Sequence, residues 1–340
     1  ATTFVDLGVP PLCQTHISPE QLNAMEPFYP LHALVCDQCL LVQLDEFVAP
    51  DDIFTEYAYF SSYSDSWLEH AATYCRTISE RLGLGPESFV VELASNDGYL
   101  LRNFVEAGIR CLGVEPAANV ADVAIERGVP TLAEFFGAGT ASAILKEHGP
   151  ADLMVGNNVL AHVPDLNDFV SGIGILLADD GVLTMEFPHL LRLMDEAQFD
   201  TIYHEHFSYF SFLTVTKVFR SHNLEVFDVD ELPTHGGSLR IYVAHTGCNE
   251  VRGSVGKLLE AEREAGLGTR AGYTNFQGRV DAIKRDLLSF LVDAKRAGKQ
   301  IVGYGAPGKG NTLLNYCGIG RDFLDYTVDR NPYKQGKYTP

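Results

Sequence analysis

Short apolar runs alternate with amphipathic stretches over residues 89–188. The run "FVVEL" at 89–93 is typical of a buried parallel strand, and the turn "ASNDG" and the amphipathic stretch "YLLRNFVEAG" follow it. The pattern then repeats as strand "RCLGVEP", helix "NVADVAIERG", strand "VPTL", strand "ADLMVGNN", a helix over 165–181 and strand "GVLTMEF". Because strands and helices alternate repeatedly, this region predicts an α/β fold with a doubly wound sheet.

The regions on either side have different patterns. Residues 1–50 contain prolines and short apolar pieces with little helical period, which indicates a small β-rich module. Residues 201–247 predict a helix near 213–222 and two antiparallel strands, and a charged helical stretch follows over about 252–297. From residue 299 the order strand, glycine turn, helix, strand begins a second α/β unit. We therefore expect three domains, over residues 1–50, 51–250 and 251–340.

The composition argues against several classes of protein. The formal net charge is −20 at pH 7, which repels the phosphates of nucleic acid. The chain contains no apolar stretch of the roughly 18 residues that a membrane span needs, and its first residues show no signal-peptide pattern. Seven scattered cysteines favour reduced thiols over a disulfide framework. We expect a cytoplasmic monomer without nucleic-acid or membrane partners.

The pair Cys36 and Cys39 in "CDQC" has the spacing of zinc ligands. A structural zinc ion needs four ligands, and two thiolates provide half of them. Cys13 and His16, or a cysteine pair upstream of Ala1, are the candidates for the other half. The alternative is two cysteines in a turn without a metal.

A polar turn follows the first predicted strand of the sheet. Glu92, Asn96, Asp97 and Gly98 lie where this strand passes into its helix, which is the usual ligand crevice of an open α/β sheet. The turn has no G-x-G-x-x-G pattern for a pyrophosphate and contains carboxylates instead. It therefore favours a cationic ligand over a dinucleotide.

Polar residues at two further strand ends extend this site. Glu115, followed by Pro116, stands about twenty residues beyond the turn, where an acid can bind ribose hydroxyls. Asn157 and Asn158 begin the loop "NNVLAHV" after a later strand. Together with the acidic turn, these positions resemble the S-adenosylmethionine site of class I methyltransferases. The alternative is that the polar residues only cap helices.

The segment "GYGAPG" at 303–308 matches G-x-G-x-x-G between a predicted strand and a helix, with Asp329 about twenty residues further on. Lys309 and Asn311 fall in the first helical turn, where backbone N–H groups and one ammonium can hold a diphosphate. NAD and a nucleoside-diphosphate sugar fit equally well. A tight glycine turn without a ligand is the third interpretation.

The segment "YHEHF" concentrates chemistry at one place in the chain. A metal interpretation uses His204 and His206 and needs two more ligands, from His162, His189 or His235. An acid/base interpretation needs one imidazole, a carboxylate to orient it and tyrosine hydroxyls. A purely structural polar core is the third possibility, because each buried polar group needs a partner.

Taken together, these motifs resemble the S-adenosylmethionine-dependent sugar C-methyltransferases that act on nucleotide-linked 4-keto-deoxysugars. The resemblance covers nearly the whole chain and rests on the order of "CDQC", "EYAYFSSYS", "VVELASNDGYLL", "GVEPAANVA", "NNVLAHV", "YHEHFSYFS", "LPTHGGSLR" and "GYGAPGKGNTLLNYCGI". It implies an N-terminal zinc module, a central class I methyltransferase domain and a C-terminal Rossmann-like domain for the sugar nucleotide. It also implies that a second cysteine pair belongs before Ala1 and that the last domain continues past Pro340.

The same resemblance assigns roles to individual residues. It implies that His206 is the catalytic base, with Glu205 and Tyr203 beside it and His162 and Tyr57 in the same pocket. The implied substrate-binding residues are His235, Gly236, Gly237, Lys309 and Asn311.

The expected reaction transfers a methyl group from S-adenosylmethionine to C3, next to the ketone, of a dTDP-linked 4-keto-6-deoxy sugar. A base would remove the C3 proton while a hydroxyl or imidazole donor stabilises the enolate oxygen. The alternatives are a sugar O-methyltransferase and an NAD-dependent nucleotide-sugar oxidoreductase.

Overall fold

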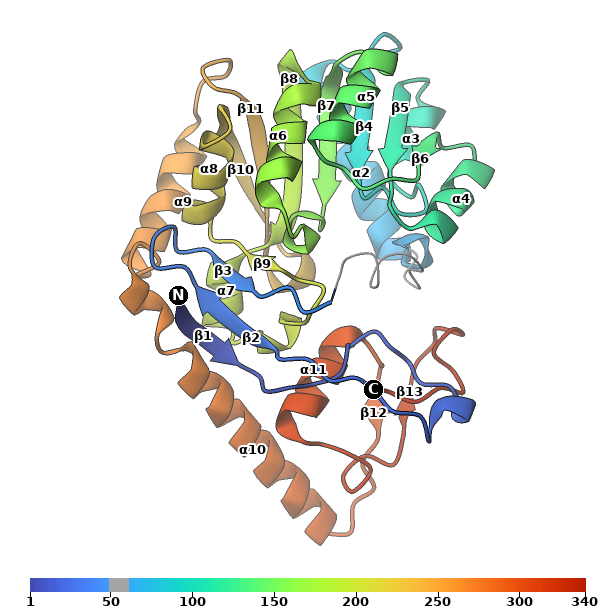
Figure 1. Ribbon diagram of the computed structural model, residues 1–340, viewed down its shortest axis with the longest axis vertical. Coiled ribbons are helices and arrows are strands. Elements are labelled where there is room, and N and C mark those ends of the chain that lie inside the picture. The colour runs from blue at the N-terminus through green and yellow to red at the C-terminus, as the bar shows by residue number, and fades with distance from the viewer. Residues whose placement is uncertain (49–60) are drawn as a thin grey trace. The chain divides into compact units, whose positions relative to one another are not determined.

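The computed structural model describes residues 1–48 and 61–340, and the chain divides into two compact units (Figure 1). Unit 1 contains Ala1–Phe47, Leu190–Ser211 and Glu262–Pro340. Unit 2 contains Val48–His189 and Phe212–Ala261. Each unit is therefore built from segments that are not contiguous in the sequence. The three consecutive domains expected from the sequence stay a prediction. The two compact units combine segments from different parts of the sequence and do not correspond to them one to one.

Unit 2 is organised around a seven-stranded sheet. Its strands are β4 (Phe89–Leu93), β5 (Arg110–Val114), β6 (Thr131–Leu132), β7 (Ala151–Asn157), β8 (Leu177–Pro188), β10 (Leu224–Leu232) and β11 (Ser238–His245). The order across the sheet is β10-β11-β8-β7-β4-β5-β6. Only β11 runs antiparallel to its neighbours. The doubly wound α/β sheet predicted from the alternating pattern is confirmed.

Helices cover both faces of this sheet. On one face, α2 (Asp65–Leu82), α3 (Leu101–Glu106) and α4 (Ala118–Glu126) share a buried apolar core with the strands. On the other face lie α5 (Ala138–His148), α6 (Leu166–Leu176) and α8 (Phe212–Arg220), with α5 and α6 in front of the strands in Figure 1. The sequence pattern did not predict α5.

The predicted helix over 165–181 is too long. Helix α6 ends at Leu176, and β8 starts at Leu177, which pairs with Ala151 of β7. A Cβ on Gly181 would lie 2.7 Å from the carbonyl oxygen of Ala151, so the two backbones approach closely there. Strand pairing thus ends the helix even though the apolar pattern continues.

Unit 1 contains a four-stranded antiparallel sheet with the order β1-β2-β3-β9. Its strands are β1 (Thr2–Asp6), β2 (His32–Val35), β3 (Val42–Leu44) and β9 (Ser208–Tyr209). The first three form the β-rich module expected at the N-terminus. The fourth comes from the histidine-rich segment, and its Tyr209 pairs with Val42. This segment is therefore part of the same sheet as the N-terminal module.

The helices of unit 1 pack around this sheet and around a small second one. The elements are α7 (Leu190–Asp195), α10 (Phe276–Arg296), α11 (Gly308–Cys317) and the parallel pair β12 (Gly303–Tyr304) and β13 (Thr327–Val328). Phe276 of α10 stacks on Phe4 of β1 with ring centroids 4.5 Å apart. The strand, glycine turn, helix and strand expected from residue 299 onward are confirmed.

The charged stretch over 252–297 forms two helices rather than one. Helix α9 (Gly253–Glu264) and α10 are separated by a 3-10 turn, Arg270–Tyr273. Gly266 adopts a φ of +91°, which a helix does not allow. The hydroxyl of Tyr273 donates to the carbonyl oxygen of Leu267 and closes this connection.

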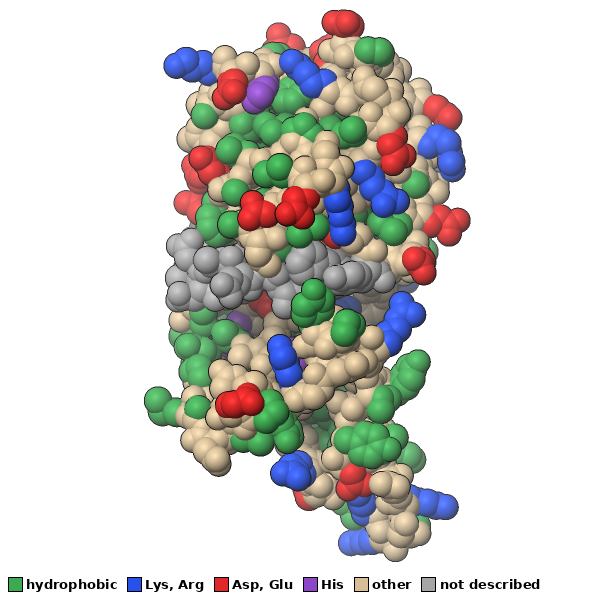
Figure 2. Space-filling view, turned by 90° about the vertical axis from the view of Figure 1, so that its right-hand side faces the viewer, with side chains coloured by type: hydrophobic (Ala, Val, Ile, Leu, Met, Phe, Trp, Pro, Cys, Tyr) green, Lys and Arg blue, Asp and Glu red, His purple; other side chains and the backbone are tan. Residues whose placement is uncertain are grey.

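The surface bears charged side chains of both signs. Figure 2 shows acidic side chains scattered over the face that it draws, with Lys and Arg between them. Among the helices of the described part of the chain, none combines the length and the apolar composition needed to cross a membrane.

Gly113 of β5 tests the packing beneath the polar turn. A Cβ at this position would lie 2.3 Å from Ser95 Oγ and 2.9 Å from Ser95 Cβ, so Gly113→Ala should destabilise the protein by about 1–3 kcal/mol. Gly139→Ala in α5 is the matched control, because no atom lies within 4 Å of its new Cβ. Thermal unfolding should show a lower midpoint only for Gly113→Ala, and equal midpoints for the two variants would contradict this packing.

Candidate functional site

The turn after β4 has an unusual backbone. Ala94 and Asn96 both have positive φ, 54° and 49°, in a region that residues with a Cβ seldom adopt. Gly98 also has a positive φ, and a Cβ there would lie 2.9 Å from Val129 Cγ2. Such strain is concentrated at functional sites, so it marks this turn as a candidate ligand site.

The carboxylate of Glu115 holds the turn in place. One oxygen accepts from the backbone N–H of Asn96 and the other from that of Ala117, each at 2.9 Å. The side-chain oxygen of Asn96 accepts from the backbone N–H of Ser61. Each Glu115 oxygen keeps a second acceptor site, so ribose hydroxyls can still bind there. Pro116 follows Glu115 and is half-buried.

Two further acidic side chains, those of Asp97 and Glu92, are buried at the turn. Asp97 is fully buried and accepts from Arg127 Nη1 at 2.8 Å and from the hydroxyl of Ser62. Glu92 is 1% exposed, and burial, together with the charges of Glu115 and Asp97, raises its pKa well above the usual range. One oxygen of Glu92 and one of Asp97 have no hydrogen-bond partner within the described residues.

The loop after β7 adds amide groups to the same edge of the sheet. Asn157 ends β7, and Asn158 has a φ of +56° and donates its backbone N–H to the carbonyl oxygen of Glu186 at 2.7 Å. The side-chain oxygens of both asparagines are buried without a partner in the described part of the chain. His162 lies in the 3-10 turn Leu160–His162 that follows.

These unpartnered buried oxygens indicate which chemical groups a ligand of this site must have. Buried acceptors need donors, and negative charge favours a cation. S-adenosylmethionine presents an ammonium and a sulfonium, together with ribose hydroxyls as donors. The residues around the turn after β4 therefore fit this molecule, and the acidic turn is a poor match for a dinucleotide.

The histidine-rich segment forms a tight turn in unit 1. The backbone N–H of His206 donates to the carbonyl oxygen of Tyr203 at 2.9 Å, and the two rings are 4.0 Å apart between centroids. His206 Nδ1 lies 2.9 Å from the carbonyl oxygen of Thr201. Since a carbonyl only accepts, Nδ1 must bear the hydrogen. The basic lone pair of the neutral imidazole is therefore on Nε2.

Glu205 and His204 precede His206 in the sequence and have different environments. Glu205 is 5% exposed, and burial raises its pKa to about 7, although Gln14 partly offsets this by hydrogen bonding. One Glu205 oxygen has no partner among the described residues. His204 Nε2 donates to the carbonyl oxygen of Tyr29 at 3.2 Å, and burial lowers the pKa of His204. His204 thus ties the turn to the N-terminal segment.

The glycine turn and helix α11 belong to the same unit as His206. Helix α11 packs against the 3-10 turn Phe199–Thr201, and Lys309 interacts electrostatically with Asp200. Asn311 is buried and donates to the carbonyl oxygen of Cys13 at 2.6 Å. The first helical turn of α11 is therefore close to the backbone that orients His206.

Asp329 occupies part of the predicted diphosphate site. Its carboxylate accepts from the backbone N–H of Ala306 at 2.8 Å, which is an amide of the glycine turn. Lys334 donates to the carbonyl oxygen of Ala306, also at 2.8 Å. The diphosphate roles of Lys309 and Asn311 stay predictions.

Cys36 and Cys39 lie in the loop between β2 and β3, and neither forms a disulfide. Backbone hydrogen bonds lower the pKa of Cys36, which favours the thiolate that binds metals. Cys13 and His16 do not complete a site with them, because no group of three or more His, Cys, Asp or Glu residues within 1–48 and 61–340 is arranged to hold a metal ion. Cys36 and Cys39 can therefore supply two of the four ligands, and an upstream cysteine pair stays a prediction for the other two.

The metal interpretation of the histidine-rich segment is also not supported by the described residues. His204 and His206 bond to backbone carbonyls, and His162, His189 and His235 belong to unit 2. Tyr57, expected in the catalytic pocket, lies outside the described residues. The 3-10 turn Thr234–Gly236 before β11 contains His235 and Gly236, and Gly237 follows it.

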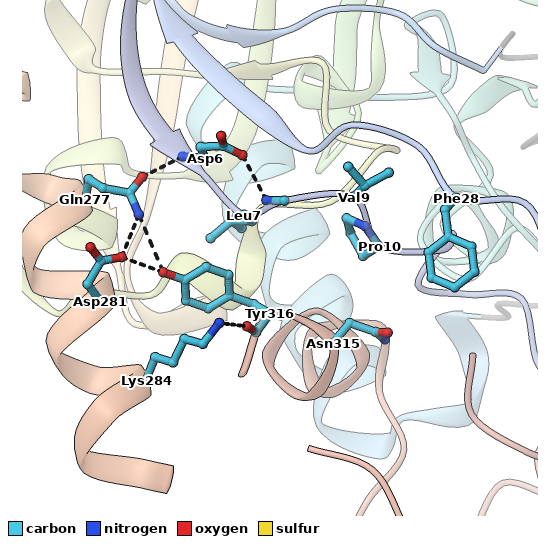
Figure 3. A pocket seen from close by; sticks show the side chains of 11 residues that line it. Asp6, Leu7, Val9, Pro10, Phe28, Gln277, Asp281, Lys284, Asn315 and Tyr316 are labelled. Carbon is cyan, nitrogen blue, oxygen red and sulfur yellow. Dashed lines mark hydrogen bonds between the residues drawn. The ribbon is translucent and has the colours of Figure 1, made fainter. Parts of the chain in front are cut away.

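A pocket of about 450 Å³ in unit 1 is lined by none of the predicted site residues (Figure 3). Its walls come from the segment after β1 and from α10 and α11. At one end, Asp281 accepts from the hydroxyl of Tyr316 and from Gln277, both at 2.7 Å. At the other end lie the apolar side chains of Val9 and Phe28.

The sequence analysis missed one buried cluster in unit 2. Glu186 is fully buried at the end of β8 and pairs with Arg240 of β11 at 2.7 Å. His70 of α2 joins them through Glu186. The available signal was a single charged residue inside each of two apolar strands, "GVLTMEF" and "SLRIYVAH".

The sheet order, its one antiparallel strand and the acidic turn define a class I S-adenosylmethionine-dependent methyltransferase. Family models agree: "Methyltransferase domain" matches residues 67–229, "C-methyltransferase C-terminal domain" 233–340 and "Putative zinc binding domain" 1–54. The chain is 37% identical to the C-methyltransferase NovU of Streptomyces niveus over 99% of its own length and 80% of that protein. The chain belongs to the C-methyltransferase family.

Solved structures also match about half of the chain. An S-adenosylmethionine-dependent methyltransferase from Clostridium acetobutylicum is 11% identical, with a TM-score of 0.43 over 53% of this chain and 92% of that one. A magnesium protoporphyrin IX methyltransferase from Synechocystis is 13% identical, with a TM-score of 0.40 over 53% of this chain and 82% of that one.

Glu115→Ala tests the cofactor site. Loss of a charged hydrogen-bonding group should weaken S-adenosylmethionine binding about tenfold or more, measured by calorimetry. Glu126→Ala, on the exposed surface of α4, is the control and should bind like the wild type. Unchanged affinity of Glu115→Ala would remove this residue from the cofactor site.

Glu205→Gln tests the charge state of the buried acid. The pKa of Glu205 is about 7 in the folded protein, above its usual value of 4.5. The native state therefore binds more protons than the unfolded state between these values, and stability falls as the pH rises through them. The neutral variant should be more stable than the wild type by about 1–3 kcal/mol at pH 8 and by less at pH 5. Thermal midpoints that differ equally at both pH values would contradict this.

Proposed function

We propose that this C-methyltransferase acts on a dTDP-linked 4-keto-6-deoxy sugar and methylates C3, the carbon next to the ketone. The observation that supports the proposal most directly is the orientation of His206, whose Nδ1–H is bonded to the carbonyl oxygen of Thr201. This bond leaves a basic nitrogen, Nε2, suited to removing a proton. Methylation of such a carbon would belong to deoxysugar biosynthesis.

The chemistry requires a base and a stabiliser of negative charge. A C–H bond next to a ketone becomes acidic because the enolate places its charge on oxygen. His206 Nε2 would remove the C3 proton, and a donor must hydrogen-bond the C4 oxygen as charge develops. Tyr203 is our candidate donor, since its ring lies against His206. Alternatives are His162 of unit 2 and Tyr57.

When bound, S-adenosylmethionine supplies an electrophilic methyl group. The acids of unit 2 would hold it, with Glu92 and Asp97 toward its positive groups and Glu115 toward its ribose. General base assistance contributes about 10²–10⁴ in rate, whereas alignment of the reacting atoms contributes about 7–11 kcal/mol. Positioning should therefore contribute more to the rate than the base does.

The sugar nucleotide needs local positive groups, because the protein as a whole has a charge of −20. The N-terminus of α11 offers backbone N–H groups and Lys309. Burial lowers the pKa of Lys309, and Asp200 raises it. We assign the diphosphate to this helix end, and contacts with the acceptor to His235, Gly236 and Gly237.

His206→Asn tests the base. Asparagine keeps an N–H near the Nδ1 position and can still donate to Thr201, so the turn should remain folded. Methyl transfer to a dTDP-linked 4-keto sugar should fall about 10²–10⁴-fold, while the affinity for S-adenosylmethionine stays unchanged. Deuterium uptake at C3 without methyl donor should also be lost, measured by mass spectrometry and NMR.

His204→Gln is the matched control, because its amide can reach the position of Nε2 and keep the bond to Tyr29, and His204 has no assigned role in catalysis. It should keep most of the activity. A fully active His206→Asn variant would rule out His206 as the base. A methyl group on oxygen, with no deuterium at C3, would instead indicate an O-methyltransferase.

A further inference from the structure

Unit 2 contains a buried ion pair that the assigned cofactor residues do not explain. Glu186 and Arg240 are opposite each other on β8 and β11, with Arg240 Nη2 2.7 Å from Glu186 Oε2. They are 0% and 8% exposed. Because burying two charges is costly, such a pair is weak evidence for stability alone. The residues around the pair indicate that it positions a neighbouring side chain.

The accessible member of this group is His70 of α2. Its Nε2 lies 3.0 Å from Glu186 Oε2, and its side chain is 23% exposed. Burial tends to raise the pKa of Glu186, but the hydrogen bond from His70, the charge of Arg240 and the hydroxyl of Thr234 lower it overall. Arg240 Nη2 lies 3.1 Å from the same Nε2, so both charged groups meet His70 at Nε2, and Nδ1 is the other ring nitrogen.

Aromatic packing fixes the plane of this imidazole. Trp67, one helical turn earlier, stacks on His70 with centroids 4.9 Å apart and planes at 18°. Trp67 also packs against Tyr99, which directly follows the polar turn, at 6.2 Å. His70 is therefore held at Nε2 by Glu186 and Arg240 and across its face by Trp67, as a preorganised functional imidazole requires.

A strained pair of residues lies beside the same group. Asn158 and His235 both have positive φ, 56° and 52°, and their side chains are 3.4 Å apart between Nδ2 and Nε2. His235 packs edge-on against Trp67 at 5.4 Å. The side-chain oxygen of Asn158 is buried without a partner within the described residues. Strain in two residues with a Cβ at one place indicates a functional site.

The position of these residues in the sheet is that of a ligand site. Asn158 follows β7, Glu186 is near the end of β8, and Tyr99 follows the turn after β4. The carboxyl ends of these three parallel strands form the crevice in which open α/β sheets bind ligands. The acids after β4 and β5 suit the cationic methyl donor, so the groups beside β8 are available for the molecule that receives the methyl group.

We propose that His70 contacts the methyl acceptor and hydrogen-bonds one of its oxygen atoms through Nδ1. Glu186, Arg240 and Trp67 are positioning residues that fix its ring. For the class of acceptor, an oxygen-rich sugar, this inference rests on the proposed function. No sequence motif pointed to His70 or Trp67.

Two substitutions of His70 separate binding from structure. The amide of Gln reaches the position of Nε2 and keeps the bond to Glu186, whereas the amide of Asn lies near Nδ1 and loses that bond. If Nδ1 contacts the acceptor, His70→Gln should raise the KM for the acceptor tenfold or more, and His70→Asn should raise it less. The affinity for S-adenosylmethionine should stay within twofold, and thermal midpoints show that both variants fold.

His222→Gln, in the same unit and hydrogen-bonded to Asn167, is the control and should behave like the wild type. A wild-type KM in His70→Gln would show that the Glu186 bond is the only role of His70 and would overturn the proposal. A weaker affinity for S-adenosylmethionine with an unchanged acceptor KM would also overturn it, because His70 would then serve the cofactor.

The acceptor panel should contain both keto and hydroxy sugar nucleotides. If only oxygen is methylated, the proposed function fails, but the comparison of His70 variants can still be made with that acceptor. If no sugar nucleotide is turned over, calorimetric binding of the panel replaces KM. A panel in which none binds to the wild type would overturn both proposals.

Discussion

Buried negative charge at the carboxyl ends of the parallel strands is the constraint on which the ligand site of unit 2 depends. Glu92, Asp97 and Glu115 are nearly inaccessible to water, and a buried carboxylate must be neutralised, hydrogen-bonded or protonated. Backbone N–H groups satisfy Glu115, and Arg127 partly satisfies Asp97. The remaining oxygens lack donors among the described residues, and a cationic ligand with ribose hydroxyls would provide them.

The same constraint shapes unit 1 with a different outcome. Burial raises the pKa of Glu205 to about 7, and the hydrogen bond with Gln14 offsets this only in part. The neighbouring His206 is oriented by its bond to the backbone carbonyl of Thr201. The two units therefore treat acids differently: unit 2 binds them to backbone N–H groups and arginines, and unit 1 leaves one near its titration point. The first arrangement suits ligand binding, and the second suits proton transfer.

Strand pairing decides which parts of the chain form a unit. Two residues of β9 extend the N-terminal sheet and attach the histidine-rich turn to it. Helix α11, about one hundred residues later in the sequence, packs against the turn before it. A module that looks like a separate zinc domain thus shares its sheet with the short strand that follows the candidate base. We infer that the N-terminal module supports the orientation of His206 as well as any metal that Cys36 and Cys39 help to bind.

The sequence by itself determined the doubly wound sheet, the acidic turn and the family, because these depend on local patterns: apolar runs of strand length, turn residues at strand ends and motifs in a fixed order. It also singled out the segment around His206, since two histidines and a glutamate in five residues are conspicuous, while the choice of His206 as the base came from the family resemblance and stays a prediction. It did not predict α5, the true ends of α6, or the division of the stretch after residue 252.

Only the tertiary structure decided that His206 is oriented by Thr201, that His204 holds Tyr29 and that Glu186, Arg240 and His70 meet. The Tyr29 and Arg240 contacts join residues far apart in the sequence, so their partners are set by tertiary packing, and the His206 bond depends on how the local turn closes.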